Sequence, residues 1–113
     1  MLKTKALRPS WREKKRYIVY EVQGSTQPMN RLQEQLIQKL KELLGVFIAS
    51  QAGIMPVKHE GRKGILKVNY TAVDYIKACF VLITTLAQEQ VAIRSINVSG
   101  ILKQAKTHLQ IKE

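Results

Sequence analysis

Apolar residues follow two periods along the chain, and the order of these periods predicts a mixed fold. Residues 17–22 alternate and are rich in β-branched and aromatic side chains, which predicts a strand. Apolar residues then recur at spacings of three and four, which predicts a helix. Asn30 can cap its start, and Gly53 ends it. Gly45 interrupts the pattern, so the segment is predicted to be one kinked helix or two.

Residues 54–59 and 65–70 predict a second and a third strand. Pro56 in the former indicates an edge strand or an irregularity, because proline cannot donate a hydrogen bond to a sheet. Residues 60–64 between the strands begin and end near glycine, which is typical of a hairpin loop. The two strands are therefore expected to pair in antiparallel fashion.

The last third of the chain predicts two helices around a fourth strand. Thr71 and Asp74 have the spacing of a capping box, and helical periodicity continues to Gln88. The centre of this segment is apolar all round and could be read as a strand, but its length and its cap favour a buried helix. Residues 91–98 predict the strand, and residues 99–111 predict the last helix, with an apolar stripe.

The apolar stripe of that last helix is formed by Ile101, Leu102, Ala105 and Leu109. Lys103, Lys106 and Lys112 lie off the stripe. Helical residues three and four apart share a face, so the apolar face is expected to pack on the domain and the lysines to face solvent.

The order strand, helix, strand, strand, helix, strand predicts an α+β fold. It is the order of the split βαβ (ferredoxin-like) arrangement, a four-stranded antiparallel sheet with two packed helices. Residues 17–113 are expected to form this single domain, and residues 1–16 a basic N-terminal arm. Ser10 and Glu13 predict a short helix in the arm, so that an extra helix stands at each end of the chain.

The charge balance points to the class of partner. The 113 residues include 19 Lys and Arg against eight Asp and Glu, a net charge of +11. Because such an excess repels itself in a compact chain, a polyanionic partner is expected, nucleic acid first and an anionic membrane surface second. No apolar stretch approaches the ~20 residues of a membrane span, and no secretory signal is recognisable. The lone Cys79 cannot form an internal disulfide and fits a reducing, cytoplasmic setting as a buried thiol.

Side chains that would build a catalytic site are few. The eight acids are scattered, and His59, His108 and Cys79 lack zinc-ligand spacing. Gly24 and Arg31 loosely resemble the phosphate loop of acylphosphatases, which share the split βαβ fold, but six intervening residues make the cradle too slack. We therefore expect no catalytic residue, and no metal or cofactor bound by the protein.

The cations gather in three places that predict phosphate contacts. The N-terminal arm is the richest, and its Trp11 would either stack on an unpaired base or pack the arm onto the domain. A second group lies at the hairpin, and a third at the start of the last helix, where free N–H groups predict an anion site. The candidate RNA-binding residues are Lys3, Lys5, Arg8, Trp11, Arg12, Lys14, Lys15, Arg16, Arg62, Lys63, Ser99, Gly100, Lys103 and Lys106.

The third strand does not carry the aromatic pattern by which RNA-recognition-motif domains stack bases. Its residues 64–70 read GILKVNY, without the RNP1 aromatics. Sequence reading of single strands by the sheet face is therefore not expected. Recognition of folded RNA through its shape and backbone fits these residues better.

Three ordered segments resemble the archaeal ribonuclease P protein component 2 family, which is related to a subunit of eukaryotic ribonuclease P and MRP. They are residues 7–18 (LRPSWREKKRYI), residues 64–69 followed by Val73 and Asp74, and residues 91–105 (VAIRSINVSGILKQA). Together they span nearly the whole chain. The resemblance implies a non-catalytic subunit of the endoribonuclease that removes 5′ leaders from precursor tRNA, with the chemistry done by the RNA subunit and Mg²⁺.

The resemblance also implies partners and contact residues. Family members bind ribonuclease P RNA, pair with a TIM-barrel-like subunit called component 3, and self-associate in a two-plus-two assembly. Contact with precursor tRNA would be only indirect. At position 11 the chain has Trp11, where the family pattern has an aliphatic residue. The residues implied for RNA contact are Arg8, Arg12, Lys14, Lys15 and Arg16. The alternative is a structural adaptor that bridges other ribonuclease P proteins without major RNA contact.

Overall fold

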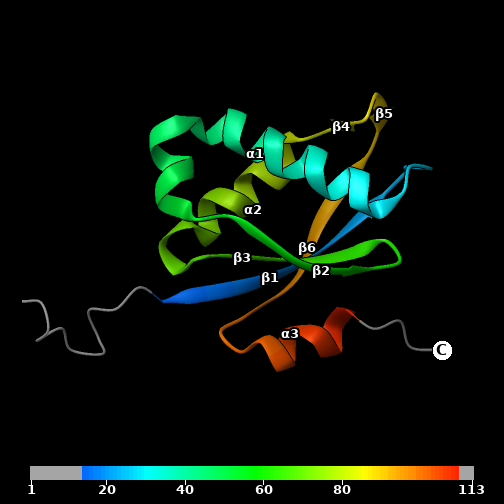
Figure 1. Ribbon diagram of the computed structural model, residues 1–113. Helices are drawn as coiled ribbons and strands as arrows, with labels where there is room; N and C mark the ends of the chain where they lie inside the picture. Colours follow the sequence, from blue (N-terminus) through cyan, green and yellow to red (C-terminus); the bar gives the residue numbers. More distant parts are fainter. Residues whose placement is uncertain (1–13, 110–113) are drawn as a thin grey trace, which may run out of the picture.

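The computed structural model describes residues 14–109, and Figure 1 shows their strands and helices. The elements are β1 (Lys15–Gln23), α1 (Met29–Ala52), β2 (Met55–Glu60), β3 (Lys63–Asn69), the 3₁₀ helix η2 (Tyr70–Ala72), α2 (Val73–Leu82), β4 (Thr85–Leu86), β5 (Glu89–Gln90), β6 (Ala92–Ser99) and α3 (Leu102–Leu109). The helix expected in the arm, and the candidates Lys3, Lys5, Arg8, Trp11 and Arg12, lie outside the described residues.

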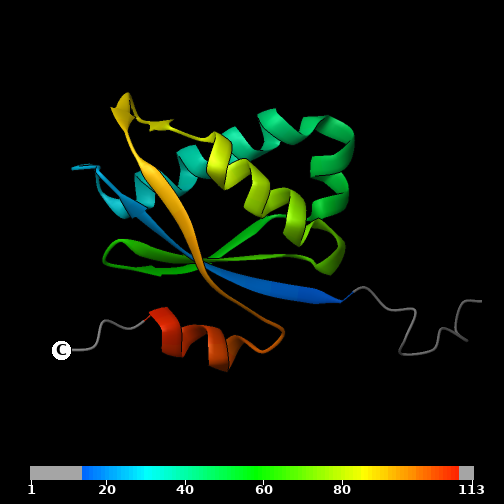
Figure 2. The ribbon, with the colours of Figure 1, turned by 180° about the vertical axis from the view of Figure 1, so that it is seen from behind.

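Four strands form one antiparallel sheet in the order β2-β3-β1-β6. Figures 1 and 2 show α1 and α2 on one side of this sheet and α3 on the other. The predicted α+β class and four-stranded antiparallel sheet are confirmed. Among residues 14–109, no helix is long and apolar enough to cross a membrane.

The main core lies between the sheet and the two helices α1 and α2. Ile18, Tyr20 and Val22 alternate along β1 and are fully buried, as the period of two predicts. The ring of Tyr20 meets that of Phe80 with centroids 5.8 Å apart. Each such side chain contributes about 1.5–3 kcal/mol when it is buried. The predicted burial of Cys79 is also confirmed, and burial raises the pKa of its thiol.

A second, smaller core lies under α3 on the opposite face of the sheet. Val19, Ile65 and Ala105 are fully buried there, and Tyr17, Ile96 and Leu102 pack around them. The prediction that Ile101 belongs to the buried stripe is wrong, because its side chain is 57% exposed. Ile101 precedes the helix, and its N–H donates to the Ser99 hydroxyl at 3.0 Å. This hydrogen bond holds Ile101 in the turn that leads into α3.

The kink and the end of α1 agree with the glycine predictions. Gly45 has φ 82° and ψ 165° inside the helix, and Gly53 ends it in the left-handed conformation at φ 59°. Glycine tolerates both because it has no Cβ. The prediction that Asn30 caps the helix is wrong, since Pro28 holds the capping position and Asn30 lies inside the helix. The carbonyl of Pro28 accepts the N–H of Leu32 at 3.1 Å.

The helix predicted to reach Gln88 ends earlier, at Leu82. Ile83 is extended, and the chain then forms the short hairpin of β4 and β5, with Ala87 and Gln88 at positive φ. The β-branched run of residues 83–85 favours extended backbone over helix. The predicted cap is also wrong: the 3₁₀ turn η2 precedes α2, and Ala72 holds the capping position without a side-chain hydrogen bond.

The edge strand β2 has the irregularity that Pro56 predicted. Its pairing register with β3 shifts between Pro56 and Lys58, and every residue of β2 is exposed. The hairpin turn is tighter than expected, because only Gly61 and Arg62 separate the two strands. Lys63 consequently lies in β3 and not in a loop.

Candidate nucleic-acid interface

Charge is divided unevenly between the helices α1 and α2 and the rest of the described chain. The two helices carry Arg31, Lys39, Lys41 and Lys77 against Glu34, Glu42 and Asp74. The remaining described residues carry Lys14, Lys15, Arg16, Lys58, Arg62, Lys63, Lys67, Arg94, Lys103 and Lys106 against Glu21, Glu60 and Glu89. The positive potential is therefore concentrated on the sheet, its turns and α3, and a polyanion would be attracted there.

The described cations of the predicted arm and the start of α3 meet at one end of the sheet. Tyr17 of β1 pairs with Ser99 of β6, which places the start of β1 beside the start of α3. A Cβ on Gly100 would lie 3.4 Å from Nη1 of Arg16, so the guanidinium lies directly against this turn. Residues far apart in sequence thus form one basic corner, defined here as Lys14, Arg16, Tyr70 and Gly100.

Lys15 and Lys14 are fixed differently at this corner. The ammonium of Lys15 donates to Oδ1 of Asn69 at 2.8 Å, and Nδ2 of Asn69 donates in turn to the carbonyl of Gln51. The Lys15 ammonium is therefore held by a hydrogen bond to β3, in addition to carrying a positive charge. The backbone carbonyl of Lys14 accepts the N–H of Tyr70 at 2.8 Å, while its side chain is exposed.

Ser99 and Gly100 turn the chain from β6 into α3. The Ser99 hydroxyl accepts the N–H of Ile101 and donates toward the side chain of Gln104 at 3.1 Å, and Ser99 is only 6% exposed. The sequence predicted that free N–H groups at this turn bind an anion. One of them, the N–H of Ile101, is instead hydrogen-bonded to Ser99 within the chain. Lys103 and Lys106 are exposed, and a spacing of three places them on the same side of α3.

The third cation group lies at the other end of β1. Arg62 donates from Nη1 to the carbonyl of Gln27 at 2.6 Å, and Lys63 stands opposite Glu21 and Glu60 in the strand register. The pairs Lys15–Asn69 and Glu21–Lys63 are six residues apart along β1, which is about 20 Å at the rise of a strand. The structure therefore brings Lys14 and Arg16 to the start of α3, and leaves the hairpin group apart.

The loop between β1 and α1 closes on a carboxylate of the chain itself. Ser25 Oγ, Thr26 N and Thr26 Oγ1 donate to the carboxylate of Glu89 at 2.6, 3.0 and 2.7 Å. These hydrogen bonds, led by that from Ser25, lower the pKa of Glu89. Because an acidic side chain takes up these donors, the loop is not free to cradle a phosphate as an acylphosphatase loop does.

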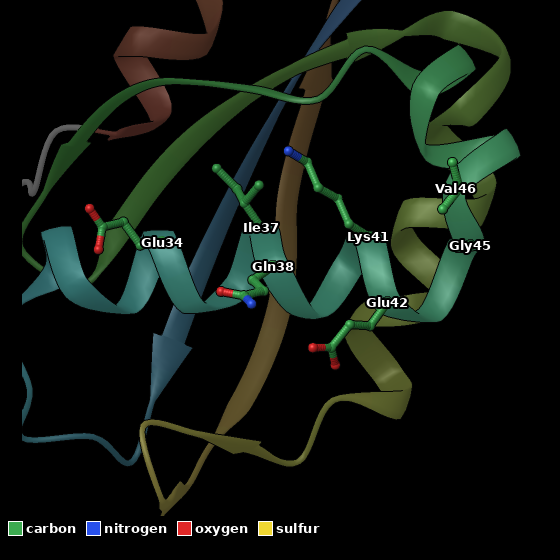
Figure 3. Close-up of a pocket in the computed structure, with 7 residues that line it drawn as sticks. All are labelled: Glu34, Ile37, Gln38, Lys41, Glu42, Gly45 and Val46. Atoms are coloured by element: carbon green, nitrogen blue, oxygen red, sulfur yellow. The ribbon is translucent and has the colours of Figure 1, made fainter.

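Two open hollows lie side by side along the bend in α1. The larger, about 660 Å³, is drawn in Figure 3, where Ile37 and Lys41 project to one side of the helix and Gln38 and Glu42 to the other. The smaller, about 430 Å³, shares Lys41 and Val46 with it. In residues 14–109, no group of His, Cys, Asp and Glu could hold a metal ion. We call this feature the α1 groove, and its lining combines Ile37 and Val46 with the polar side chains Glu34, Gln38, Lys41 and Glu42.

Sequence patterns did not single out one residue of the basic corner, Tyr70. It was placed at the end of the third strand, yet it is half exposed and lies against Arg16, whose Cζ is 5.9 Å from the ring centroid. The only sequence signal was an aromatic residue directly after a strand. Tyr70 lies close to Arg16 because β1 pairs with β3.

Comparison with known proteins gives consistent matches. Residues 16–110 match the Rpp14/Pop5 family. The chain is 36% identical over 107 residues to ribonuclease P protein component 2 of Methanocaldococcus jannaschii, covering 94% of this chain and 78% of that protein. It is 30% identical over 103 residues to the protein of the same name from Methanosarcina mazei, covering 89% and 88%. A chain in the cryo-EM structure of yeast ribonuclease MRP has the same fold, with a TM-score of 0.63, 12% identity, and coverage of 89% and 79%.

Proposed function

The chain belongs to the Rpp14/Pop5 family and is a protein subunit of ribonuclease P, and on this premise we propose that it binds the catalytic RNA directly. In that role it supports removal of 5′ leaders from precursor tRNA, in the cytoplasm of an archaeal cell. The RNA and its Mg²⁺ perform the chemistry, and the protein itself binds no cofactor. The chain contributes cations on a rigid scaffold.

The uneven division of charge is the observation that supports RNA contact. Lys14 and Arg16 lie at the basic corner, and Lys103 and Lys106 are on α3 beside it. The cations of the arm directly precede Lys14 in the sequence, so we propose that they continue the same RNA contact. Lys63 and Arg62 would form a second, separate contact at the hairpin.

Phosphate neutralisation is the proposed mechanism. RNA phosphates crowd when the catalytic RNA compacts, and fixed lysine and arginine side chains offset this repulsion with release of counterions. Less Mg²⁺ is then needed to hold the active fold of the RNA. Because these contacts reach the backbone and not base edges, they would position the RNA without reading its sequence.

The α1 groove is the proposed site for another protein subunit. Val46 is 89% exposed and Phe47 75% exposed at the bend, and the helices around them are nearly neutral. Exposed apolar side chains of this size are typical of protein interaction sites. We assign this surface to component 3, the partner that the family resemblance implies, within a two-plus-two assembly built on a split βαβ framework.

A matched pair of double variants tests the RNA contact. Lys103→Ala with Lys106→Ala removes two charges from α3, while Lys39→Ala with Lys77→Ala removes two from α1 and α2. Each lost phosphate contact reduces the slope of log K against log salt by about one. We expect the α3 variant to bind ribonuclease P RNA more weakly, with a slope smaller by about two, and the control to bind like the wild type.

The structural adaptor remains the second candidate, and the α1 groove is the observation that favours it. It predicts that the complete chain alone does not bind ribonuclease P RNA at low salt and binds only with its protein partner present. It also predicts that the two double variants bind ribonuclease P RNA with the same affinity and the same salt slope. The first result would contradict direct RNA binding, and the second would contradict the contact through α3.

A further inference from the structure

We infer that Tyr70 and Arg16 form a stacking site for one unpaired RNA base at the basic corner. This inference rests on the proposed function, because the cations must first hold an RNA there. It goes beyond contact with the RNA backbone, because Tyr70 and Arg16 would bind the flat face of a nucleobase.

The ring of Tyr70 is exposed but its backbone is fixed. Its side chain is 50% exposed, whereas the aromatic residues Tyr20 and Phe80 lie in the core. Its N–H donates to the carbonyl of Lys14 at 2.8 Å, at the residue where the described chain begins. A tyrosine side chain has only two rotatable bonds, so the ring loses little conformational freedom when a base stacks on it. Stacking on aromatic side chains is the usual way in which proteins hold unpaired bases.

Arg16 supplies the second part of the site. Its Cζ lies 5.9 Å from the centre of the Tyr70 ring, within the range of a cation–π contact. Nη1 donates to the carbonyl of Lys15 at 3.0 Å, which orients the guanidinium. Gly100 lies beside it, since a Cβ at this position would be in ordinary van der Waals contact with Nη1, at 3.4 Å. A guanidinium is planar and stacks on bases, which a lysine ammonium does not do.

The surroundings favour an unpaired nucleotide over a duplex. Lys14 is exposed, and its backbone carbonyl is hydrogen-bonded to the N–H of Tyr70, so a phosphate next to the stacked base would have a lysine within its neighbourhood. The faces of bases within a duplex are already covered by their neighbours, and only a loop, bulge or end offers a free face. The site would therefore tolerate different bases and select unpaired ones.

The test uses the complete chain and two RNA probes, ribonuclease P RNA and a fully paired RNA duplex. Tyr70→Ala should weaken binding to ribonuclease P RNA roughly 5- to 150-fold, the range found for loss of one stacked base. Tyr70→Phe keeps the ring and should bind within about twofold of the wild type. The salt slope should not change, because stacking releases no counterions. Duplex binding should be equal for all three proteins.

Two controls separate stacking from folding and from charge. Tyr75→Ala removes an α2 ring that is 55% exposed, and it should bind like the wild type. Arg16→Lys keeps the charge and should weaken binding to ribonuclease P RNA without changing the salt slope. If Tyr70→Ala and Arg16→Lys bind like the wild type, the stacking site is wrong while the proposed function stands. If the wild type ignores both RNAs at low salt, the proposed function itself fails.

Discussion

A Cβ on Gly64 would lie 2.5 Å from the hydroxyl oxygen of Tyr20. The two residues face each other across β1 and β3, and the tyrosine side chain lies over the glycine in the main core. Real Cβ atoms essentially never come so close to another heavy atom. Gly64 is therefore required for space, so that Tyr20, the largest fully buried side chain among residues 14–109, fits over the neighbouring strand.

Replacing Gly64 with alanine should destabilise the fold. The added methyl overlaps the ring of Tyr20, and overpacking of a core costs about 1–3 kcal/mol. Urea unfolding followed by circular dichroism measures the loss. Gly100→Ala is the matched control, because its nearest neighbour is the flexible end of Arg16 at 3.4 Å. An unfolding midpoint for Gly64→Ala equal to that of Gly100→Ala would contradict this packing.

The hydroxyl of Tyr20 has a partner of its own, and its removal should be costly. Nε2 of Gln33 donates to it at 2.9 Å, and Gln33 is 7% exposed. Tyr20→Phe leaves this buried donor unpaired, which costs about 1–3 kcal/mol of unfolding free energy. Denaturant unfolding of the single variant gives this value.

The double variant Tyr20→Phe with Gln33→Leu is the informative comparison. When both partners become apolar, no buried polar group is left unpaired, and much of the loss should be recovered. We expect the double variant to unfold at a higher urea concentration than Tyr20→Phe. Additive losses from the two substitutions would show that the hydrogen bond is unimportant.

The carboxylate of Glu89 should make stability depend on pH. Its hydrogen bonds with Ser25 and Thr26 lower its pKa below the ordinary value of 4.5. A lowered folded-state pKa adds stability that is present above pH 4.5 and is lost as the pH falls through the lowered value. The wild type should therefore exceed Glu89→Gln in stability at pH 7, and the gap should narrow towards pH 3. A gap that is constant over this range in urea titrations would refute the assignment.

Loss of the α3 lysines should raise the Mg²⁺ requirement of the holoenzyme. If these cations offset phosphate repulsion, the Lys103→Ala and Lys106→Ala double variant leaves more of that task to Mg²⁺. Precursor tRNA cleavage, measured against Mg²⁺ concentration in a reconstituted enzyme, should shift to higher concentration. The Lys39→Ala and Lys77→Ala variant should not shift, and equal curves for both would count against the mechanism.

The periodicity of the sequence predicted most of the framework because the core is regular. Alternation along β1 and the glycines at positions 45 and 53 correspond to buried faces and helix breaks. The helix expected to reach Gln88 was wrong because the β-branched run of residues 83–85 favours extended backbone. The chain then turns back on itself, where the N–H of Val91 donates to the carbonyl of Thr84 at 2.9 Å beside the β4–β5 hairpin. Local propensity does not reveal such a contact.

The candidate site was less predictable because it is assembled from distant parts of the chain. Charge clustering identified Arg16, and the predicted helix N-terminus identified Gly100, yet their contact depends on the pairing of β1 with β6. Tyr70 was missed since an aromatic residue at a strand end is ordinary in a sequence. Arg62 was placed correctly at the hairpin, but its hydrogen bond to Gln27 became visible only in the structure.

Lysine footprinting of the complete chain, with and without ribonuclease P RNA, tests the central claim most directly. An amine-reactive reagent followed by mass spectrometry gives the modification rate of each lysine. We predict that RNA slows the reaction of Lys14, Lys103 and Lys106 and leaves Lys39 and Lys77 unchanged. Protection of Lys39 and Lys77 with no effect on the other three, or no protection at all, would contradict an RNA interface on the basic corner and α3.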